Sequence, residues 1–310
     1  MTKTDAHNQP RHPLATGREK LLGHLAMLLF AALIAGSFSI GHKAAPYIGA
    51  AALNAVRFAL GTGLMAALLY IVNRPAIRPP ESLWRFIVLG GLMASYFVLM
   101  FVALRISNPV STGAMFTLIP LMSAGFGWFF LRQVTRPVVF LSLLVAAAGA
   151  VWVIFRADIS AILAFDIGRG ESIFFAGCVA HAAYAPLVRK FNRGEPVMQF
   201  TVYTLAATTV WILLVAGPQL VTTDFASLPP IVWLAIAYLA IFTTAGTFFL
   251  LQFASLRLPA SKVLAYGYLT PSFIILIEGT VGHGWAGLPV IAGALLTACA
   301  LLVMAFAPDA

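Results

Sequence analysis

Long, unbroken apolar runs dominate the hydrophobic pattern of this chain. Each run is close to the length of about 20 residues that an α-helix needs to cross a bilayer. None shows the alternating polarity of a membrane β-strand. Lipid offers the backbone no hydrogen-bond partners, so the runs are predicted to span the membrane as helices. Ten spans are predicted, at residues 22–42, 48–72, 84–105, 108–131, 137–155, 172–189, 197–217, 230–252, 260–281 and 286–307.

Composition excludes an ordinary soluble fold. Of the 310 residues, 61% are hydrophobic and 9% are charged, whereas soluble domains carry roughly a quarter charged residues. The lipid bilayer is therefore an expected partner of the chain. The net charge of +9 does not indicate nucleic acid, because no basic nucleic-acid motif accompanies it. Cys178 and Cys299 lie in apolar runs and form neither a metal-binding spacing nor a disulfide framework, so we expect no metal and no cofactor.

The basic residues orient the predicted spans. With the N-terminus placed inside, the outer segments and span ends hold only Lys43, Arg105, Arg156 and Arg169, and Arg57 lies within a span. All the other Lys and Arg residues then fall on the inner side. Positive charge accumulates on the cytoplasmic side of membrane proteins. We therefore expect a multi-pass protein of the cell (inner) membrane with both termini in the cytoplasm.

Two halves of the chain show related patterns. Residues 101–105 read Phe-Val-Ala-Leu-Arg and are followed by Pro120; residues 253–257 read Phe-Ala-Ser-Leu-Arg and are followed by Pro271. Five spans in each half make the second half enter the membrane in the opposite direction, which is typical of secondary transporters with inverted repeats. The predicted organisation is a flexible cytoplasmic tail at 1–21, a first five-helix repeat at 22–155, an extracytoplasmic linker at 156–171 and a second, inverted repeat at 172–307.

Several short motifs carry a resemblance to a known family. They are Gly36-Ser37-Phe38 followed by Lys43, then Arg57, and the segment 182–185 (Ala-Ala-Tyr-Ala) before Arg189-Lys190. On these residues the chain resembles the ten-helix, EamA-like permeases of the drug/metabolite transporter superfamily. Within it, the chain is most similar to bacterial exporters of aromatic amino acids, and the resemblance implies that kind of substrate.

The chain also departs from that family. Many members end the fourth and ninth spans with a Leu-Gly-Glu type sequence. Here the first of these sites reads Leu131-Arg132-Gln133, and the second falls near Gly284 without an acid. Glu278 lies about a turn and a half earlier, so a role that the family gives to the acid does not transfer directly to this chain.

Candidate substrate-binding residues are polar or adaptable side chains inside spans, because ionisable groups in a membrane are rare and often functional. They are Ser37, Arg57, Tyr96, Met115, His181, Tyr184, Thr244, Tyr266 and Tyr268. Arg57 either contacts a substrate carboxylate or pairs with a neighbouring helix. The tyrosines offer a flat apolar face and one hydroxyl to an amphipathic ligand, or they pack in the helix bundle. The small polar residues also serve helix packing.

Other candidates concern movement of the protein. Lys43 and Glu278 lie near the outer ends of their spans, where they could pair to close an outer gate. Alternatively, Glu278 could couple transport to a proton, and Lys43 could extend its charge to the membrane interface. Pro120 and Pro271 fall at matching places and are candidate helix hinges.

The sequence predicts a transporter that exports small amphipathic metabolites by alternating access through a central cavity. An exporter of another metabolite or drug class is an alternative. An intramembrane enzyme is the other class considered, but the chain has no zinc-binding His-Glu-x-x-His, no paired aspartates and no Ser/His dyad in its spans. Proton coupling, facilitated flow and the oligomeric state stay open.

Overall fold

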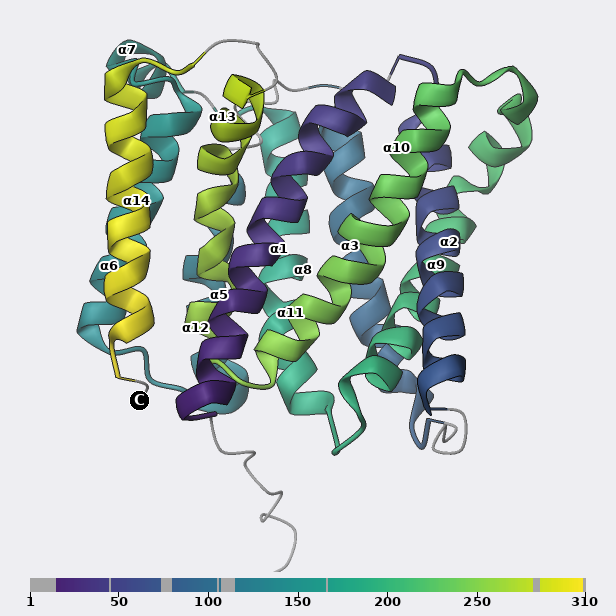
Figure 1. The fold of residues 1–310 in the computed structure, drawn as a ribbon, viewed down its shortest axis with the longest axis horizontal. Coiled ribbons are helices and arrows are strands. Elements are labelled where there is room, and N and C mark those ends of the chain that lie inside the picture. Colours follow the sequence, from purple (N-terminus) through teal and green to yellow (C-terminus); the bar gives the residue numbers. More distant parts are fainter. Residues whose placement is uncertain are drawn as a thin grey trace, which may run out of the picture.

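The computed structural model shows a bundle of long helices (Figure 1). It describes residues 15–44, 46–73, 80–104, 106, 115–165, 167–280 and 285–308. Within these ranges the chain forms helices, turns and irregular segments and no β-strand. Nine of the described helices, counting those that continue through irregular turns as one, are long and apolar enough to cross a membrane, and α5 is a shorter apolar helix.

The first half of the bundle contains five long elements and one short helix. They are α1 (Gly17–Ala44), α2 (Ala50–Asn73), α3 (Leu83–Leu104), α5 (Ile119–Leu131), α6 (Pro137–Ile154) and the short α7 (Ile159–Leu163). The hydrophobic pattern did not predict α7, which lies in the segment expected to be a linker. Its N-terminus is capped by Asp158, whose carboxylate accepts a hydrogen bond from the Ala161 N–H. Such a cap satisfies backbone donors that a short helix leaves free.

The second half repeats the same order with more irregular helices. Its elements are α8 (Arg169–Phe191), α9 (Val197–Thr222), η2 (Phe225–Ser227), α10 (Pro230–Ala240), η3 (Ile241–Gly246), α11 (Thr247–Ser255), α12 (Ala260–Val263), η4 (Leu264–Leu269), α13 (Thr270–Thr280) and α14 (Leu288–Phe306). The predicted eighth span is α10 and α11 joined by the π-helical turn η3. The predicted ninth span is α12 and α13 joined by the 3-10 turn η4.

The candidate hinge prolines stand where regular α-helix begins. Pro120 lies in the first turn of α5, and Pro271 is the second residue of α13, directly after η4. Proline is tolerated there because the first turn needs no N–H donor. Proline inside an α-helix occurs in the described residues at Pro186 of α8 and Pro218 of α9, where it removes a helical hydrogen bond.

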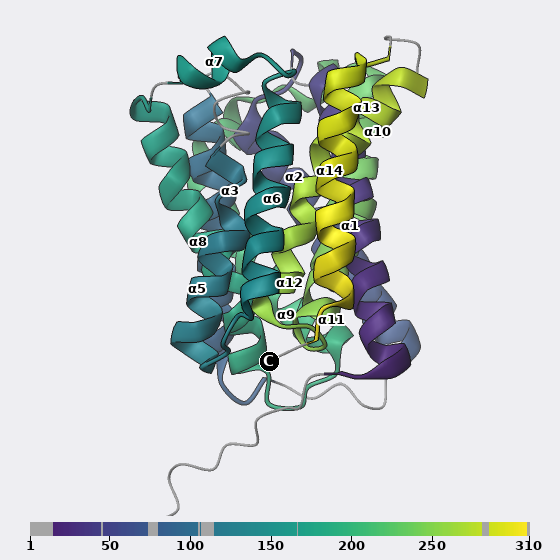
Figure 2. The same cartoon turned by 90° about the vertical axis from the view of Figure 1, so that its left-hand side faces the viewer.

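The two halves run in opposite directions through the bundle. We call the end at which α1 begins and α14 finishes the lower end, and the end that carries α7 the upper end (Figures 1 and 2). The first half therefore starts at the lower end, whereas α8 follows α7 and starts at the upper end. This is the geometry that five crossings in each half require.

The contacts between helices are also consistent with a pseudo-two-fold axis that relates the two halves. Three pairs join corresponding helices of the two halves: α2 with α9, α5 with α12, and α6 with α14. Three further kinds of contact occur twice. The contact of α3 with α8 matches that of α1 with α10 and α11, the contact of α3 with α9 matches that of α2 with α10, and the contact of α5 with α8 matches that of α1 with α13. The interior of the bundle is thus built almost entirely between the halves.

Glycine allows two of these helix pairs to approach closely. A Cβ at Gly149 of α6 would lie 2.4 Å from the Thr297 Oγ1 of α14, and a Cβ at Gly90 of α3 would lie 2.7 Å from the backbone of Ala207 in α9. Small residues at such crossings let backbones pack against each other in lipid, where no hydrophobic effect drives association.

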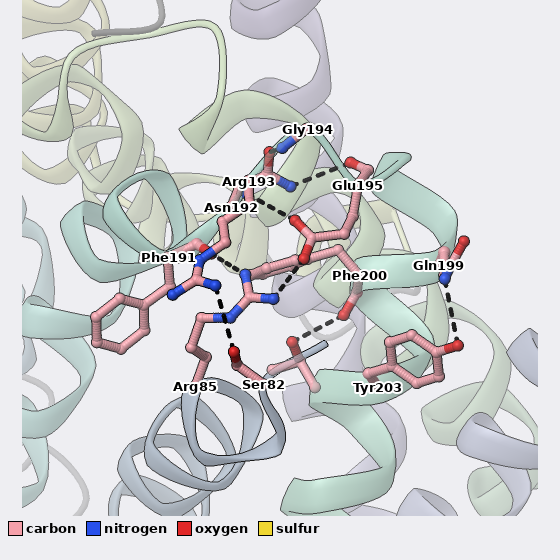
Figure 3. Close-up of polar contacts among 11 residues, drawn as sticks. Ser82, Arg85, Phe191, Asn192, Arg193, Gly194, Glu195, Gln199, Phe200 and Tyr203 are labelled. Carbon is pink, nitrogen blue, oxygen red and sulfur yellow. Dashed lines mark hydrogen bonds and ion pairs between the residues drawn. The ribbon is translucent and has the colours of Figure 1, made fainter. Parts of the chain in front are cut away.

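An ionic network fixes the lower end of α3 to the turn between α8 and α9 (Figure 3). The Arg85 side chain is 1% exposed, and its guanidinium donates to Glu195 Oε1 at 2.6 Å and to the Phe191 carbonyl. Glu195 Oε2 accepts from the Arg193 N–H at 2.6 Å. Partial burial raises the pKa of the Glu195 carboxyl, but these hydrogen bonds outweigh it and hold the pKa below its ordinary value. We call this group, Arg85 with residues 191–195, the lower corner.

The corresponding place at the upper end is apolar. There the N-terminal part of α10 packs against the turn between α1 and α2. The buried residues that meet are Ala44, Ile48, Ala52, Leu53, Val232, Ala235, Ile236 and Leu239, which we call the upper corner. Val232 is the third residue of α10, as Arg85 is the third residue of α3, so each side chain lies in the first turn of its helix.

Candidate functional site

Arg57 is a buried cation in the upper half of α2. The side chain is 8% exposed, and its guanidinium carbon lies 5.1 Å from the centre of the Phe58 ring and 4.9 Å from that of Phe97 in α3. Aromatic faces attract a cation at these distances. The Arg57 Nε nevertheless has no hydrogen-bond partner among the described residues. A buried donor without a partner is costly, so this atom is available to an anionic ligand.

Tyr96 and His181 form a stacked pair next to Arg57. The ring centroids of Tyr96 in α3 and His181 in α8 lie 4.5 Å apart, with the rings inclined by 28°. Tyr96 also contacts Phe97 edge-on at 5.0 Å, which links the pair to the Arg57 guanidinium. His181 is 4% exposed, and its Nδ1 has no partner in the described part of the chain.

Tyr184 takes part in a buried polar chain that the sequence analysis did not identify. Gln252 of α11 donates from its Nε2 to the Tyr184 hydroxyl at 2.9 Å, and its Oε1 accepts from the Thr201 hydroxyl of α9 at 2.9 Å. All three side chains are fully buried. The signal was present in the sequence: Gln252 is an amide inside the apolar run from Phe248 to Ala254.

Aromatic contacts join these groups into one cluster. Phe248 of α11 lies edge-on to Phe58 at 5.7 Å and to Tyr184 at 6.3 Å. The chain of contacts therefore runs from His181 through Arg57 to Gln252. We call the central cluster Arg57, Phe58, Tyr96, Phe97, His181, Tyr184, Phe248 and Gln252.

Two further predicted residues have buried hydroxyl groups without partners. Thr244 in the π-helical turn η3 is 0% exposed and Tyr268 in η4 is 1% exposed, and neither hydroxyl is hydrogen-bonded within the described ranges. Both lie in the irregular turns that interrupt the eighth and ninth spans. Irregular backbone at membrane depth is tolerated where it is buried in protein or lines a cavity.

The remaining predicted residues either form hydrogen bonds with nearby groups or lie outside the central cluster. The Tyr266 hydroxyl is hydrogen-bonded to His24 Nδ1 of α1 at 2.8 Å. The Ser37 hydroxyl donates to the Ile34 carbonyl one turn earlier, at 2.6 Å. Met115 is buried before α5, and Lys43 is exposed at the upper end of α1. Glu278 belongs to α13, but its side chain is outside the described residues, so the predicted pair of Lys43 and Glu278 is too.

The chemistry of the central cluster suits binding rather than covalent catalysis. Apolar rings surround a few polar atoms that lack partners, which is the usual composition of a small-molecule site. Among the described residues, no group of three or more His, Cys, Asp or Glu side chains is placed to hold a metal ion.

Comparison with known proteins relates this chain to a family of transporters. Residues 21–155 and again residues 168–306 match the family described as "EamA-like transporter family". The chain is 25% identical over 263 residues to the Bacillus subtilis (strain 168) protein named "Uncharacterized transporter YyaM", an alignment that covers 84% of this chain and 86% of that protein. A solved structure titled "Crystal structure of protein" has a TM-score of 0.75 and 21% identity, over 92% of this chain and 95% of that chain, so the two share a fold.

Proposed function

Because this chain belongs to the EamA-like transporter family, we propose that it exports small amphipathic metabolites, above all aromatic and other large apolar amino acids. Family membership confirms the prediction of an all-α, ten-helix membrane protein in two repeats, and it makes the chain a transporter rather than an enzyme. The substrate class and the direction of transport are the proposal.

The proposed substrate class rests on the groups that surround Arg57. A cation at membrane depth, with Nε unpaired and aromatic rings on two sides, can attract a carboxylate while the rings accept an apolar side chain. The stacked Tyr96 and His181 extend that apolar surface. An amino acid with a large apolar side chain presents both kinds of group.

The bundle geometry supports alternating access as the mechanism. The cluster lies between two halves that run in opposite directions, so a rocking movement of one half against the other would expose it to each side in turn. At the lower side the turn before α12 is buried, Leu258 packs against Gly23 of α1, and Gln133 Oε1 accepts from the Ala260 N–H at 3.1 Å, contacts that would have to separate for a substrate to enter there. In the proposed orientation this is the cytoplasmic side of the inner membrane.

Uptake by liposomes that contain the purified protein tests the proposal. We expect transport of Phe, Trp, Tyr, Leu and Met with little discrimination, because one methylene in an apolar pocket is worth only about 1–3 kcal/mol. Small or strongly charged amino acids should be excluded, since they bury little apolar surface and are costly to desolvate. Robust uptake of glycine or glutamate without uptake of phenylalanine would contradict the proposal.

The Arg57→Ala variant tests the role of the cation in the same assay. Loss of the guanidinium should weaken transport of carboxylic acids more than that of neutral amphiphiles, by about tenfold or more if a charge-assisted hydrogen bond is lost. Arg57→Lys is the matched control, because it keeps the positive charge. Equal losses for acidic and neutral substrates would mean that Arg57 only supports the packing of α2 and α3.

A further inference from the structure

We infer that the Asn54 amide oxygen binds the α-ammonium group of the substrate, while Arg57 binds its carboxylate. This inference rests on the proposed function, and it narrows the substrate to zwitterionic α-amino acids. Asn54 lies in α2, three residues before Arg57 and therefore nearer the upper end.

The orientation of the Asn54 amide is fixed by its hydrogen-bond partner. An amide nitrogen only donates, and an amide oxygen or a backbone carbonyl only accepts. The Asn54 side chain is bonded to the Ala50 carbonyl at 2.6 Å, so the atom that faces this carbonyl is the nitrogen Nδ2. The reversed amide would place two acceptors against each other. The oxygen Oδ1 is therefore left to accept from another group.

The Asn54 oxygen is buried without a hydrogen-bond partner. The residue is 2% exposed, and Oδ1 has no donor among the residues that the structure describes. A buried acceptor without a donor is costly, and the lipid around the bundle cannot supply one. A donor group of the substrate at this place would remove that cost.

Asn54 and Arg57 offer complementary groups on one face of α2. Residues three apart on a helix are neighbours, with Cβ atoms about 5–6 Å apart. The Asn54 Oδ1 accepts and the Arg57 Nε donates, yet neither atom has a partner in the described part of the chain, so the two do not bond to each other. An α-amino acid carries an ammonium donor and a carboxylate acceptor on the same carbon, which matches this pair.

The surroundings of Asn54 suit the rest of the substrate as well. Phe58 lies one turn after Asn54 on α2. Its ring contacts those of Phe97 and Phe248 in the central cluster, at centroid distances of 4.9 and 5.7 Å, and these rings can accept an apolar side chain. A neutral amide also leaves Arg57 available, whereas an aspartate at 54 would pair with it across three residues and compete with the substrate carboxylate.

The experiment compares two ligands that share the ring and the carboxylate. They are phenylalanine and hydrocinnamate, which is phenylalanine without its ammonium group. Isothermal titration calorimetry gives the Kd of each for the purified protein in lipid nanodiscs. In Asn54→Leu, an isosteric apolar change, phenylalanine should bind about tenfold more weakly or worse, because a hydrogen bond to a charged group is lost. The Kd of hydrocinnamate should stay the same or fall.

Thr208→Val is the matched control. The Thr208 hydroxyl in α9 is buried and donates to the Thr204 carbonyl at 2.9 Å. This is the same kind of bond to a carbonyl one turn earlier that the Asn54 amide makes. The change replaces a buried polar side chain by an isosteric apolar one outside the central cluster, so both Kd values should stay as in the wild type. Asn54→Ala is a second variant and should repeat the selective loss for phenylalanine.

The outcomes separate this inference from the proposed function. Wild-type protein that binds neither phenylalanine nor any other large apolar amino acid refutes the proposed substrate class, and the inference with it. If the wild type binds phenylalanine, equal losses for both ligands in Asn54→Leu overturn the inference alone, because Asn54 would then act only through Arg57 or the packing of α2. An unchanged Kd for phenylalanine does the same. Hydrocinnamate binding by the variants also shows that they are folded.

Discussion

The lower and upper corners occupy corresponding places in the two repeats but are held together by different chemistry. At the lower corner, the buried Arg85 joins the start of α3 to the α8–α9 turn through Glu195 and the Phe191 carbonyl. At the upper corner, Val232 and Ile236 pack the start of α10 against the α1–α2 turn within an apolar cluster. The backbone arrangement therefore does not dictate the kind of contact that stabilises it.

The difference has a mechanical consequence. An ion pair of this kind is directional and changes with pH, because it depends on the geometry and protonation of two groups. Apolar packing tolerates small sliding movements and is indifferent to pH. We therefore expect the lower corner to hold the α8–α9 turn firmly to α3, and the upper corner to allow the α1–α2 turn more adjustment against α10.

The largest effect is expected from Arg85→Met at the lower corner. The change removes the buried donor to the partly exposed Glu195 and to the Phe191 carbonyl, and each hydrogen bond that involves a charged group contributes about 1.5–3 kcal/mol. The free energy of unfolding in mixed micelles measures it. Arg85→Met combined with Glu195→Gln should recover part of the loss. A single variant as stable as the wild type would show that the network contributes little.

A smaller loss is expected from Ile236→Ala at the upper corner. Ile236 is 1% exposed, and truncation of a buried isoleucine costs about 2 kcal/mol at the low end of the observed range. The same unfolding assay applies, and the loss should be identical at neutral and mildly acidic pH because no charge is involved. Leu234→Ala on the exposed face of α10 is the control. A loss that varies with pH would break the comparison.

The smallest effect is the pH dependence of the lower corner. The pKa of Glu195 lies below its ordinary value of 4.5 in the folded protein. Its contribution to stability is therefore fully present above that value and is lost as the pH falls through the lower, folded-state pKa. The melting temperature of the wild type should fall toward that of Glu195→Gln as the pH is lowered below about 4.5. A constant difference between them would mean that Glu195 does not titrate with folding.

The architecture was accessible from the sequence because it depends on local properties. The length of the apolar runs predicts the spans, and the distribution of Lys and Arg predicts an even number of crossings. The π-helical turn η3 and the 3-10 turn η4 were not predicted, since the surrounding residues are as apolar as those of a regular helix.

The contacts of the candidate site were less accessible. Arg85 was counted only among the charges on the inner side, because its partner Glu195 is 110 positions away in the sequence. Gln252 was passed over since a single amide in an apolar run gives no indication of what it faces. Arg57, Tyr96 and His181 were chosen for their chemistry, and only the fold places them side by side. Their roles in transport stay predictions.

The contact between Phe116 and Gly267 bears on how the two halves can diverge. These positions are 151 residues apart, the same separation as Pro120 and Pro271, and a Cβ at Gly267 would lie 3.2 Å from Phe116 Cε1. Residues that are counterparts in the two repeats thus share one space on the symmetry axis, where one is large and the other has no side chain. If both repeats had kept phenylalanine here, the two rings would collide. Two identical halves therefore cannot both place a phenylalanine here, and the present contact requires the two halves to differ at this position.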